Sequence, residues 1–382
     1  MNSRDRILAA MDLRQPDRVP VMCQLSLGHY FVQLGVDPAE YWLDNETISN
    51  CYLALAERYG FDGILINLPG RDPNVRQFVE RIETTADGQV IHYKDGSRCV
   101  CPPDDLPMHV EGPKLPLDEI EVEKLYYEDP HTPGGLKYPF HYDLEPTTEH
   151  FPESVFAIID RVLKAVNGEL SVHSEVFSPF TQLMERLGYE NGLMALLEDP
   201  GKCKAILQRF AEGAADLARR QAARGVDAVL ISSAFAGGGF VSKGMYEEFV
   251  LPYERIVATA IRDSGVKAYT HTCGAIGDRL ELMAASGIHG IDTMDPPPLG
   301  DTDLADAKKR VGSRLFLKGN IDSVNVLLRG SADQVRENAR ERIDMAAAGG
   351  GYILSSACSV APRVPAENLM VLREVAEEYG QY

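Results

Sequence analysis

The chain has 382 residues, 45% of them apolar and 25% charged, which is ordinary for a globular protein and long enough for one elaborated barrel or two domains. Its net charge of −19 disfavours nucleic acid and anionic membranes as partners, because both carry negative charge themselves. The N-terminus has no apolar core of signal-peptide length, and no stretch approaches the roughly 20 apolar residues of a membrane helix. Seven cysteines without framework spacing argue against a secreted disulfide scaffold, so we expect a cytoplasmic protein.

Short apolar or β-branched runs alternate along the chain with segments of helical periodicity. The expected strands are Arg18–Leu25, Phe61–Asn67, Leu170–Val176, Val226–Ser232, Val266–His271, Gly290–Met294, Arg314–Gly319 and Gly351–Ser356. The expected helices include Glu46–Tyr59, Lys202–Ala223, Tyr246–Ser264, Gly277–Ser286 and Ala332–Ala348. Repeated strand–helix units predict a parallel sheet, and eight of them favour an α/β fold of the (β/α)8, TIM-barrel type over an open sheet.

Residues 70–165 interrupt this alternation. The dipeptides Asp87–Gly88 and Asp95–Gly96 are typical of hairpin turns, and the following stretch is rich in proline, acidic residues and tyrosine. We interpret the region as an insertion after the second strand, formed by a β-hairpin and a long loop. Long loops on such a scaffold usually cap the site or bind a partner. The expected organisation is one barrel domain over residues 1–382 that carries this insertion.

His271, Cys273 and Cys358 carry the strongest chemical signal in the sequence, and we refer to them as the ligand triad. Imidazole and thiolate groups suit zinc, and three protein ligands leave a fourth position open, which is typical of catalytic zinc. Structural zinc modules use short, tightly spaced ligand pairs. The long separation of the two cysteines therefore requires a large folded domain to assemble the site.

Barrel enzymes place their chemistry at the carboxyl ends of the strands, and the ligand triad falls at the ends of the fifth and eighth expected strands. Glu175 ends the third strand and is a candidate catalytic group. The candidate substrate-binding residues at other strand ends are Asn67, Ser232, Asp295 and Asn320. Other interpretations remain open: His173 shares a face with Glu175, so that the two satisfy each other, and Asp295 caps a loop.

Two alternative uses of the cysteines are disfavoured. A Cys–His nucleophile pair is an alternative to metal binding, but His271 and Cys273 are too close along one chain to face each other in the usual way, and Cys358 would have no role. Cys99 and Cys101 alternate on a predicted hairpin strand without a nearby histidine, and packing on one face explains them.

Several segments together resemble the uroporphyrinogen decarboxylase superfamily. They are RDRILAAMDLRQPDRVPV near the start, FSPFTQLMERLGYENGLMALLEDP (177–200), EEFVLPYERIV (247–257), LKGNIDSVNVLLRG (317–330) and GGYILSSACSVAPRVPAENLM (350–370). The resemblance covers most of the chain and implies a (β/α)8 barrel. The superfamily includes true decarboxylases and also cobalamin-linked methyltransferases.

The sequence departs from the decarboxylase pattern at its decisive positions. Segment 21–30, VMCQLSLGHY, lacks the arginines that hold the acidic arms of a tetrapyrrole. Asn67 stands where decarboxylases carry aspartate, and Ala357-Cys358-Ser359 replaces their Gly-His-Gly. The methyltransferase motif, His-x-Cys-Gly with a late cysteine, matches the ligand triad and Gly274 residue by residue.

The resemblance therefore implies a zinc-dependent methyltransferase that moves a methyl group between a small-molecule thiol or methyl ether and a corrinoid (cobalamin) protein. The corrinoid would arrive on a separate protein, since the sequence has no Asp-x-His-x-x-Gly motif. Glu175 would orient a ligand, act as a fourth ligand or move the substrate proton. A homodimer is also implied. The alternatives are a superfamily decarboxylase with altered substrate and a non-catalytic accessory protein that binds metal or corrinoid.

Overall fold

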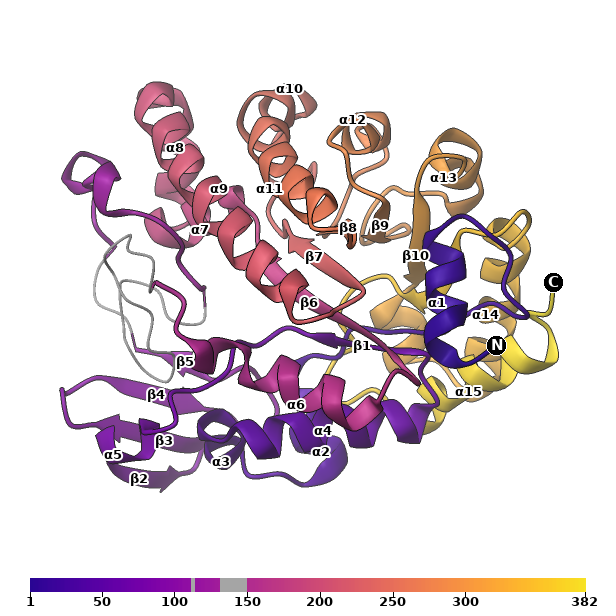
Figure 1. Ribbon diagram of the computed structural model, residues 1–382, viewed down its shortest axis with the longest axis horizontal. Helices are drawn as coiled ribbons and strands as arrows, with labels where there is room; N and C mark the ends of the chain where they lie inside the picture. The colour runs from indigo at the N-terminus through magenta and orange to yellow at the C-terminus, as the bar shows by residue number, and fades with distance from the viewer. Residues whose placement is uncertain (111–113, 131–149) are drawn as a thin grey trace.

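The computed structural model describes residues 1–110, 114–130 and 150–382. Its centre is a curled parallel sheet of seven strands (Figure 1), in the order β1-β6-β7-β8-β9-β10-β11. The strands are β1 (Gly63–Ile66), β6 (Ser171–Phe177), β7 (Ala228–Ser232), β8 (Lys267–Thr272), β9 (Gly290–Thr293), β10 (Phe316–Ile321) and β11 (Tyr352–Ser356). Each pair of neighbours is parallel, so every carboxyl end lies at the same edge of the sheet.

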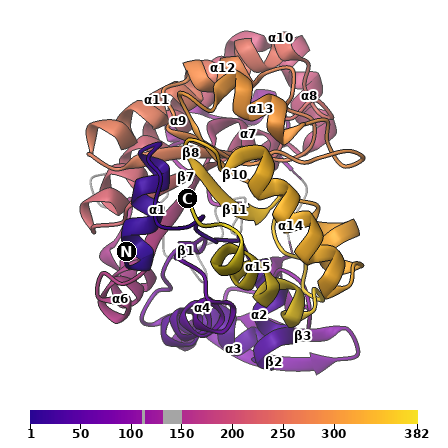
Figure 2. The same cartoon turned by 90° about the vertical axis from the view of Figure 1, so that its right-hand side faces the viewer.

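Helices surround the sheet on its outer side (Figure 2). The α-helices in the described residues are α1 (Ser3–Met11), α2 (Leu27–Leu34), α3 (Pro38–Leu43), α4 (Asn45–Tyr59), α5 (Val75–Phe78), α6 (Ala157–Val166), α7 (Pro179–Leu187), α8 (Tyr189–Glu198), α9 (Pro200–Ala223), α10 (Lys243–Met245), α11 (Leu251–Asp263), α12 (Leu280–Ala285), α13 (Leu304–Val311), α14 (Ala332–Ala346) and α15 (Ala366–Glu378). Several begin at side-chain caps; Asp199 caps α9, and Ser331 forms a capping box with Gln334 at α14.

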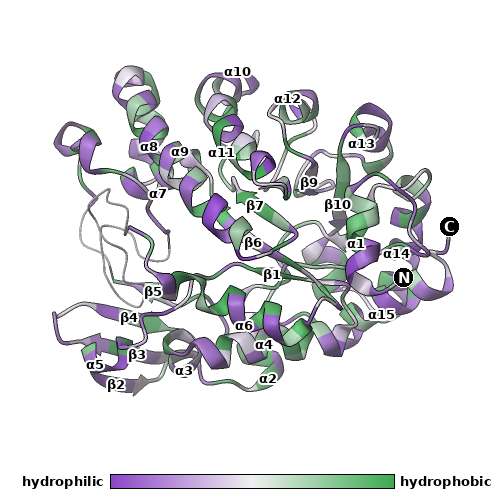
Figure 3. Cartoon of the chain, viewed as in Figure 1, coloured by the Kyte–Doolittle hydropathy of each residue, from purple (hydrophilic) through white to green (hydrophobic). Residues whose placement is uncertain are grey.

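The outer helices turn apolar faces to the sheet and polar faces to solvent, as the hydropathy colouring shows (Figure 3). In the described ranges, none of the helices combines the length and apolar character needed to span a bilayer. The predicted helix Gly277–Ser286 is shorter in the structure, since α12 begins only at Leu280.

The first expected strand, Arg18–Leu25, is not a regular strand in the structure. It forms only isolated bridges, which pair Arg18 with Gln381, Val21 with Leu354 and Leu25 with Val360. Proline at position 20 removes one backbone donor, which limits a continuous ladder. The segment still contacts both edge strands, because Leu354 N donates to Pro20 O at 2.9 Å and Asp62 N donates to Val21 O at 2.7 Å. The fold is therefore a TIM-like α/β architecture whose parallel sheet has seven regular strands within the described residues.

Asp62 ties this segment to the sheet. Its fully buried carboxylate accepts hydrogen bonds from Arg6 at 2.8 Å, from Arg18 at 2.8 and 2.9 Å and from Val21 N at 2.9 Å. Arg373 from α15 lies 3.4 Å away. One carboxylate thus links the first helix, the irregular segment, the start of β1 and the last helix, which places both termini at the same end of the molecule (Figure 1).

The inside of the curled sheet is a small apolar core of its own. It contains Met22, Leu65, Ala228, Leu230, Tyr269, Phe316 and Ile353, together with Ile7, Ala10 and Met11 of α1. Helix α1 therefore covers the amino-terminal end of the strands. Polar residues lie at the opposite end, where the strands finish, and this is the end that carries the active site in barrels of this type.

A separate antiparallel sheet follows β1. Its strands are β2 (Val79–Thr85), β3 (Gly88–Tyr93), β4 (Arg98–Cys101) and β5 (Met108–His109), and it lies at the end of the molecule away from the termini (Figure 1). Cys99 and Cys101 are both buried on β4, with their sulfur atoms 4.0 Å apart. Parts of the insertion expected over residues 70–165, namely 111–113 and 131–149, lie outside the described residues.

Candidate metal centre

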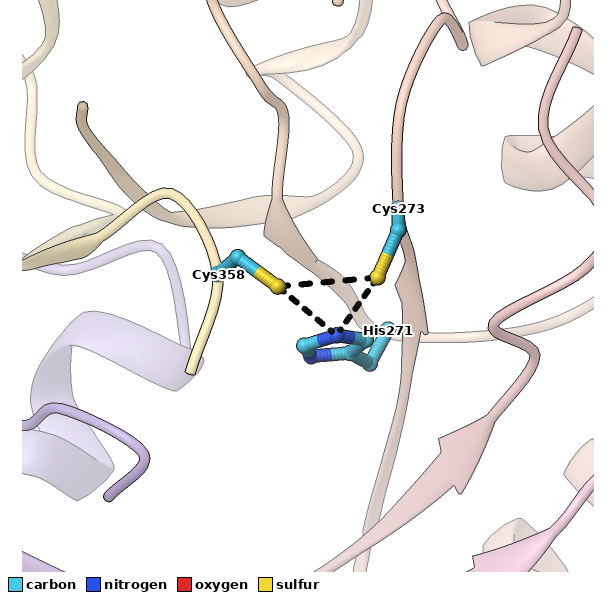
Figure 4. A group of neighbouring side chains, drawn as sticks. All are labelled: His271, Cys273 and Cys358. Atoms are coloured by element: carbon cyan, nitrogen blue, oxygen red, sulfur yellow. Dashed lines mark hydrogen bonds between the residues drawn. The ribbon is translucent and has the colours of Figure 1, made fainter. Parts of the chain in front are cut away.

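The ligand triad comes together where β8 and β11 end (Figure 4). His271 lies on β8, Cys273 directly follows that strand, and Cys358 follows β11. Cys273 Sγ lies 3.3 Å from His271 Nε2 and 3.6 Å from Cys358 Sγ, and Cys358 Sγ lies 4.0 Å from His271 Nε2. Three soft or borderline donor atoms from distant parts of the chain therefore face one common point.

These separations fit a tetrahedral zinc ion. Bond lengths of about 2.3 Å to sulfur and about 2.0–2.1 Å to nitrogen put two sulfur ligands about 3.8 Å apart, and sulfur and nitrogen about 3.6 Å apart. The observed distances of 3.3, 3.6 and 4.0 Å lie close to these values without rearrangement of the backbone. The donor set is thus compatible with zinc, and a fourth position would remain for another ligand.

Backbone contacts hold each cysteine in place. Gly274 adopts a positive φ of 79°, which turns the chain immediately after Cys273, and its N–H donates to Asp295 Oδ2 at 2.7 Å. The N–H of Cys358 donates to Ser323 Oγ at 3.0 Å, and the Ser323 hydroxyl donates to Cys358 O at 3.2 Å. The two sulfur positions are therefore set by neighbouring loops as well as by the strands.

The pKa values of the two thiols are shifted in opposite directions. The hydrogen bond from Cys273 lowers the pKa of the Cys358 thiol, and the neighbouring His271 lowers it further, against the effect of burial. The same contact and burial raise the pKa of Cys273. Loss of a second proton from this pair is opposed by the negative charge of the first thiolate, which a bound cation would offset.

Two carboxylates lie near the ligand triad in contrasting environments. Burial raises the pKa of Asp295 to about 6, against the hydrogen bond from Gly274, which lowers it. Burial also disfavours the charged form of Asp292, but the positive charge of Lys318 and the contact with His271 hold its pKa at about 2. Asp292 is therefore a permanent anion at neutral pH.

Gly237 and Gly238, in the loop that follows β7, pack against the backbone next to the ligand triad. A Cβ at Gly237 would lie 2.2 Å from Cys273 O, and Gly238 N donates to Ala275 O at 2.7 Å. The loop after β7 thus packs directly against the backbone of a ligand residue.

Gly237→Ala is expected to push the Cys273 loop away and to destabilise the fold by about 1–3 kcal/mol, as overpacking does elsewhere. Denaturant unfolding and zinc binding by chelator competition would both report the change. Gly239→Ala is the matched control, because a Cβ at that position meets open space. Equal behaviour of the two variants would contradict a structural role for Gly237.

Glu175 lies half-buried on β6, in register with Leu230 of β7 and Tyr269 of β8. His271 lies two residues further along β8 than Tyr269. His173 does not need Glu175 as a partner, because its ring nitrogens lie 2.9 Å from Tyr269 Oη and 3.1 Å from Ser171 Oγ. The hydrogen-bond partners of the His173 ring are therefore Tyr269 and Ser171, and not Glu175.

The candidate substrate-binding residues differ in how their polar atoms are used. Asn67 Oδ1 accepts from Tyr52 Oη at 2.6 Å. The amide of Asn320 donates to Met294 O at 2.8 Å, which holds the loop after β9. Ser232 pairs with His271 across the sheet. The buried Asp295 Oδ1 has no hydrogen-bond partner within the described part of the chain. Among these candidate substrate-binding residues, Asp295 therefore has a buried oxygen, Oδ1, that could accept a hydrogen bond from a ligand.

Comparison with known proteins places the chain in a family. The family model for uroporphyrinogen decarboxylase (URO-D) matches residues 139–379. A methylcobamide:CoM methyltransferase of Methanosarcina acetivorans is 24% identical over 211 residues, which cover 55% of this chain and 59% of that protein. A uroporphyrinogen decarboxylase of Ruthia magnifica is 27% identical over 285 residues, which cover 71% of this chain and 74% of that protein.

Among solved structures, a methyltransferase from Methanosarcina mazei shares the fold. The TM-score is 0.73 at 19% sequence identity, and the alignment covers 99% of both chains. The chain spans less than two thirds of the length of the curated methyltransferases that it matches. Because the family model matches most of the sequence, the protein belongs to the uroporphyrinogen decarboxylase family.

Proposed function

We propose that the protein is a zinc-dependent methyltransferase that moves a methyl group between a small-molecule thiol or methyl ether and a corrinoid carried on a partner protein. The observation that carries this proposal is the convergence of one imidazole and two sulfur atoms at separations that suit tetrahedral zinc. The curated relatives include methylcobamide:CoM methyltransferases, which supports methyl transfer to or from a corrinoid.

The residues of the site have separate tasks in this proposal. The ligand triad would hold zinc, which when bound lowers the pKa of a coordinated thiol or polarises a coordinated ether oxygen. Glu175 of β6 would take up or return the substrate proton. Asp295 Oδ1, which has no partner among the described residues, would accept a hydrogen bond from the substrate.

Decarboxylation of an acidic tetrapyrrole is disfavoured by charge. Segment 21–30 has no arginine, and the whole chain carries a net charge of −19. A substrate with several carboxylates would therefore enter this end of the barrel without the basic clamp that compensates its desolvation. Uroporphyrinogen decarboxylases nevertheless occur among the relatives, so the test must separate the two reactions.

Metal removal provides that test. Incubation with methylcobalamin and a panel of small thiols, coenzyme M among them, should yield the methylated thiol and cob(I)alamin, which is followed by its absorbance. Cob(I)alamin with methyl ethers would test the opposite direction. Dialysis against a chelator should abolish the reaction, and stoichiometric Zn²⁺ should restore it. A reaction that is unaffected by the chelator, or decarboxylation without metal, would contradict the proposal. Tight zinc or cobalamin binding without turnover would indicate an accessory protein instead.

A further inference from the structure

Two buried charged residues lie in line with His271 across neighbouring strands. The register pairs His271 on β8 with Asp292 on β9, and Asp292 with Lys318 on β10. The three residues are only 4%, 1% and 1% exposed. Lys318 Nζ lies 2.8 Å from Asp292 Oδ1, and Asp292 Oδ2 lies 3.6 Å from His271 Nδ1. They form a continuous polar line inside the curled sheet.

Stability does not account for this line. Burial of an ion pair costs desolvation that its attraction roughly offsets, so well-packed apolar residues would serve a barrel interior equally well. Much of the surrounding core is apolar, with Phe316 two residues before Lys318 on β10, although the buried His173 also lies near the two charges. The line ends at the ring nitrogen of His271 that faces away from the two sulfurs.

The two oxygen atoms of Asp292 have different partners. Oδ1 accepts from Lys318 Nζ and also from Thr293 N at 2.9 Å. Neither Oδ2 nor His271 Nδ1 has a hydrogen-bond partner in residues 1–110, 114–130 and 150–382, and these two atoms face each other at 3.6 Å. Because both donors occupy Oδ1, Oδ2 is the oxygen that remains for the imidazole.

We propose that Asp292, held by Lys318, is a positioning residue that keeps the His271 proton on Nδ1 and so directs the Nε2 lone pair between Cys273 and Cys358. A carboxylate behind a ligand histidine selects the tautomer and the ring orientation and raises the basicity of the ligating nitrogen. Lys318 fixes the carboxylate and balances its charge. This inference rests on the proposed zinc site.

Asp292→Asn tests the proposal directly, because it places a hydrogen-bond donor opposite His271 Nδ1 where the wild type has an acceptor oxygen. The amide oxygen would stay with Lys318 and Thr293 N, so the NH₂ group would face Nδ1 and favour the tautomer that carries its proton on Nε2. We expect zinc affinity, measured by competition with a chromophoric chelator, to fall about 10–100-fold. The cobalt-substituted protein should also show an altered ligand-field spectrum, which a purely structural role would not produce.

A second variant separates a specific loss of zinc affinity from misfolding caused by an unpaired buried charge. Asp292→Asn with Lys318→Met leaves no buried charge unpaired and should show the same loss of affinity. Asp227→Asn is the control, because that buried carboxylate pairs with Arg4 at 2.8 Å near the amino-terminal end of β7; its zinc affinity should equal that of the wild type. Wild-type affinity in the double variant would overturn the inference, whereas absence of zinc binding by the wild type would overturn the proposed function itself.

Discussion

We expect the wild-type protein to bind about one equivalent of zinc, and Cys358→Ser and His271→Ala each to lose that zinc and methyl transfer with it. A serine hydroxyl is nearly isosteric with the thiol but remains protonated at neutral pH, so it replaces a thiolate ligand poorly. Metal analysis of purified, zinc-replete proteins and the thiol methylation assay would measure both losses.

Cys203→Ser is the matched control for these variants. Cys203 is buried on α9, where burial raises its pKa to about 11, and it belongs to the helical layer rather than to the strand ends. The control should retain zinc and methyl transfer. Full zinc retention in both ligand variants would contradict the metal centre. Activity that survives Cys358→Ser would favour a decarboxylase-like reaction without metal.

Asp62→Ala is expected to lower the free energy of unfolding by about 3–5 kcal/mol, because removal of one partner leaves buried charges without compensation. Arg6 and Arg18 both donate to this carboxylate at 2.8 Å, and both side chains are less than 10% exposed. The loss would loosen segment 18–25, which joins the two edges of the sheet. Urea denaturation followed by circular dichroism would measure it.

Asp17→Ala provides the comparison for Asp62→Ala. Asp17 also pairs with Arg6, at 2.6 Å, but its side chain is 43% exposed. Exposed pairs contribute only about 0–1 kcal/mol, so this variant should remain close to the wild type in stability. If the two variants unfolded at the same urea concentration, Asp62 would not be the anchor that its contacts indicate.

Much of the parallel sheet is visible in the sequence. The predicted strand Val226–Ser232 corresponds to β7 (Ala228–Ser232), and Leu170–Val176 corresponds to β6 (Ser171–Phe177). Strands that are buried on both faces read as continuous apolar runs, so their positions are local information. The irregular path of Arg18–Leu25 could not be predicted in this way, because its bridges pair it with residues 354, 360 and 381 at the far end of the sequence.

The same division holds for the site. The residue types of the candidate ligands, their places at strand ends and the lack of arginine in segment 21–30 could be predicted from the sequence alone, since each is a property of single residues or short motifs. Asp292 and Lys318 leave only a weak signal, a charge within an otherwise apolar strand. Only the tertiary structure decided that they stand behind His271 and that Gly237 packs on Cys273, because strand register and loop contacts arise between segments that the chain brings together on folding.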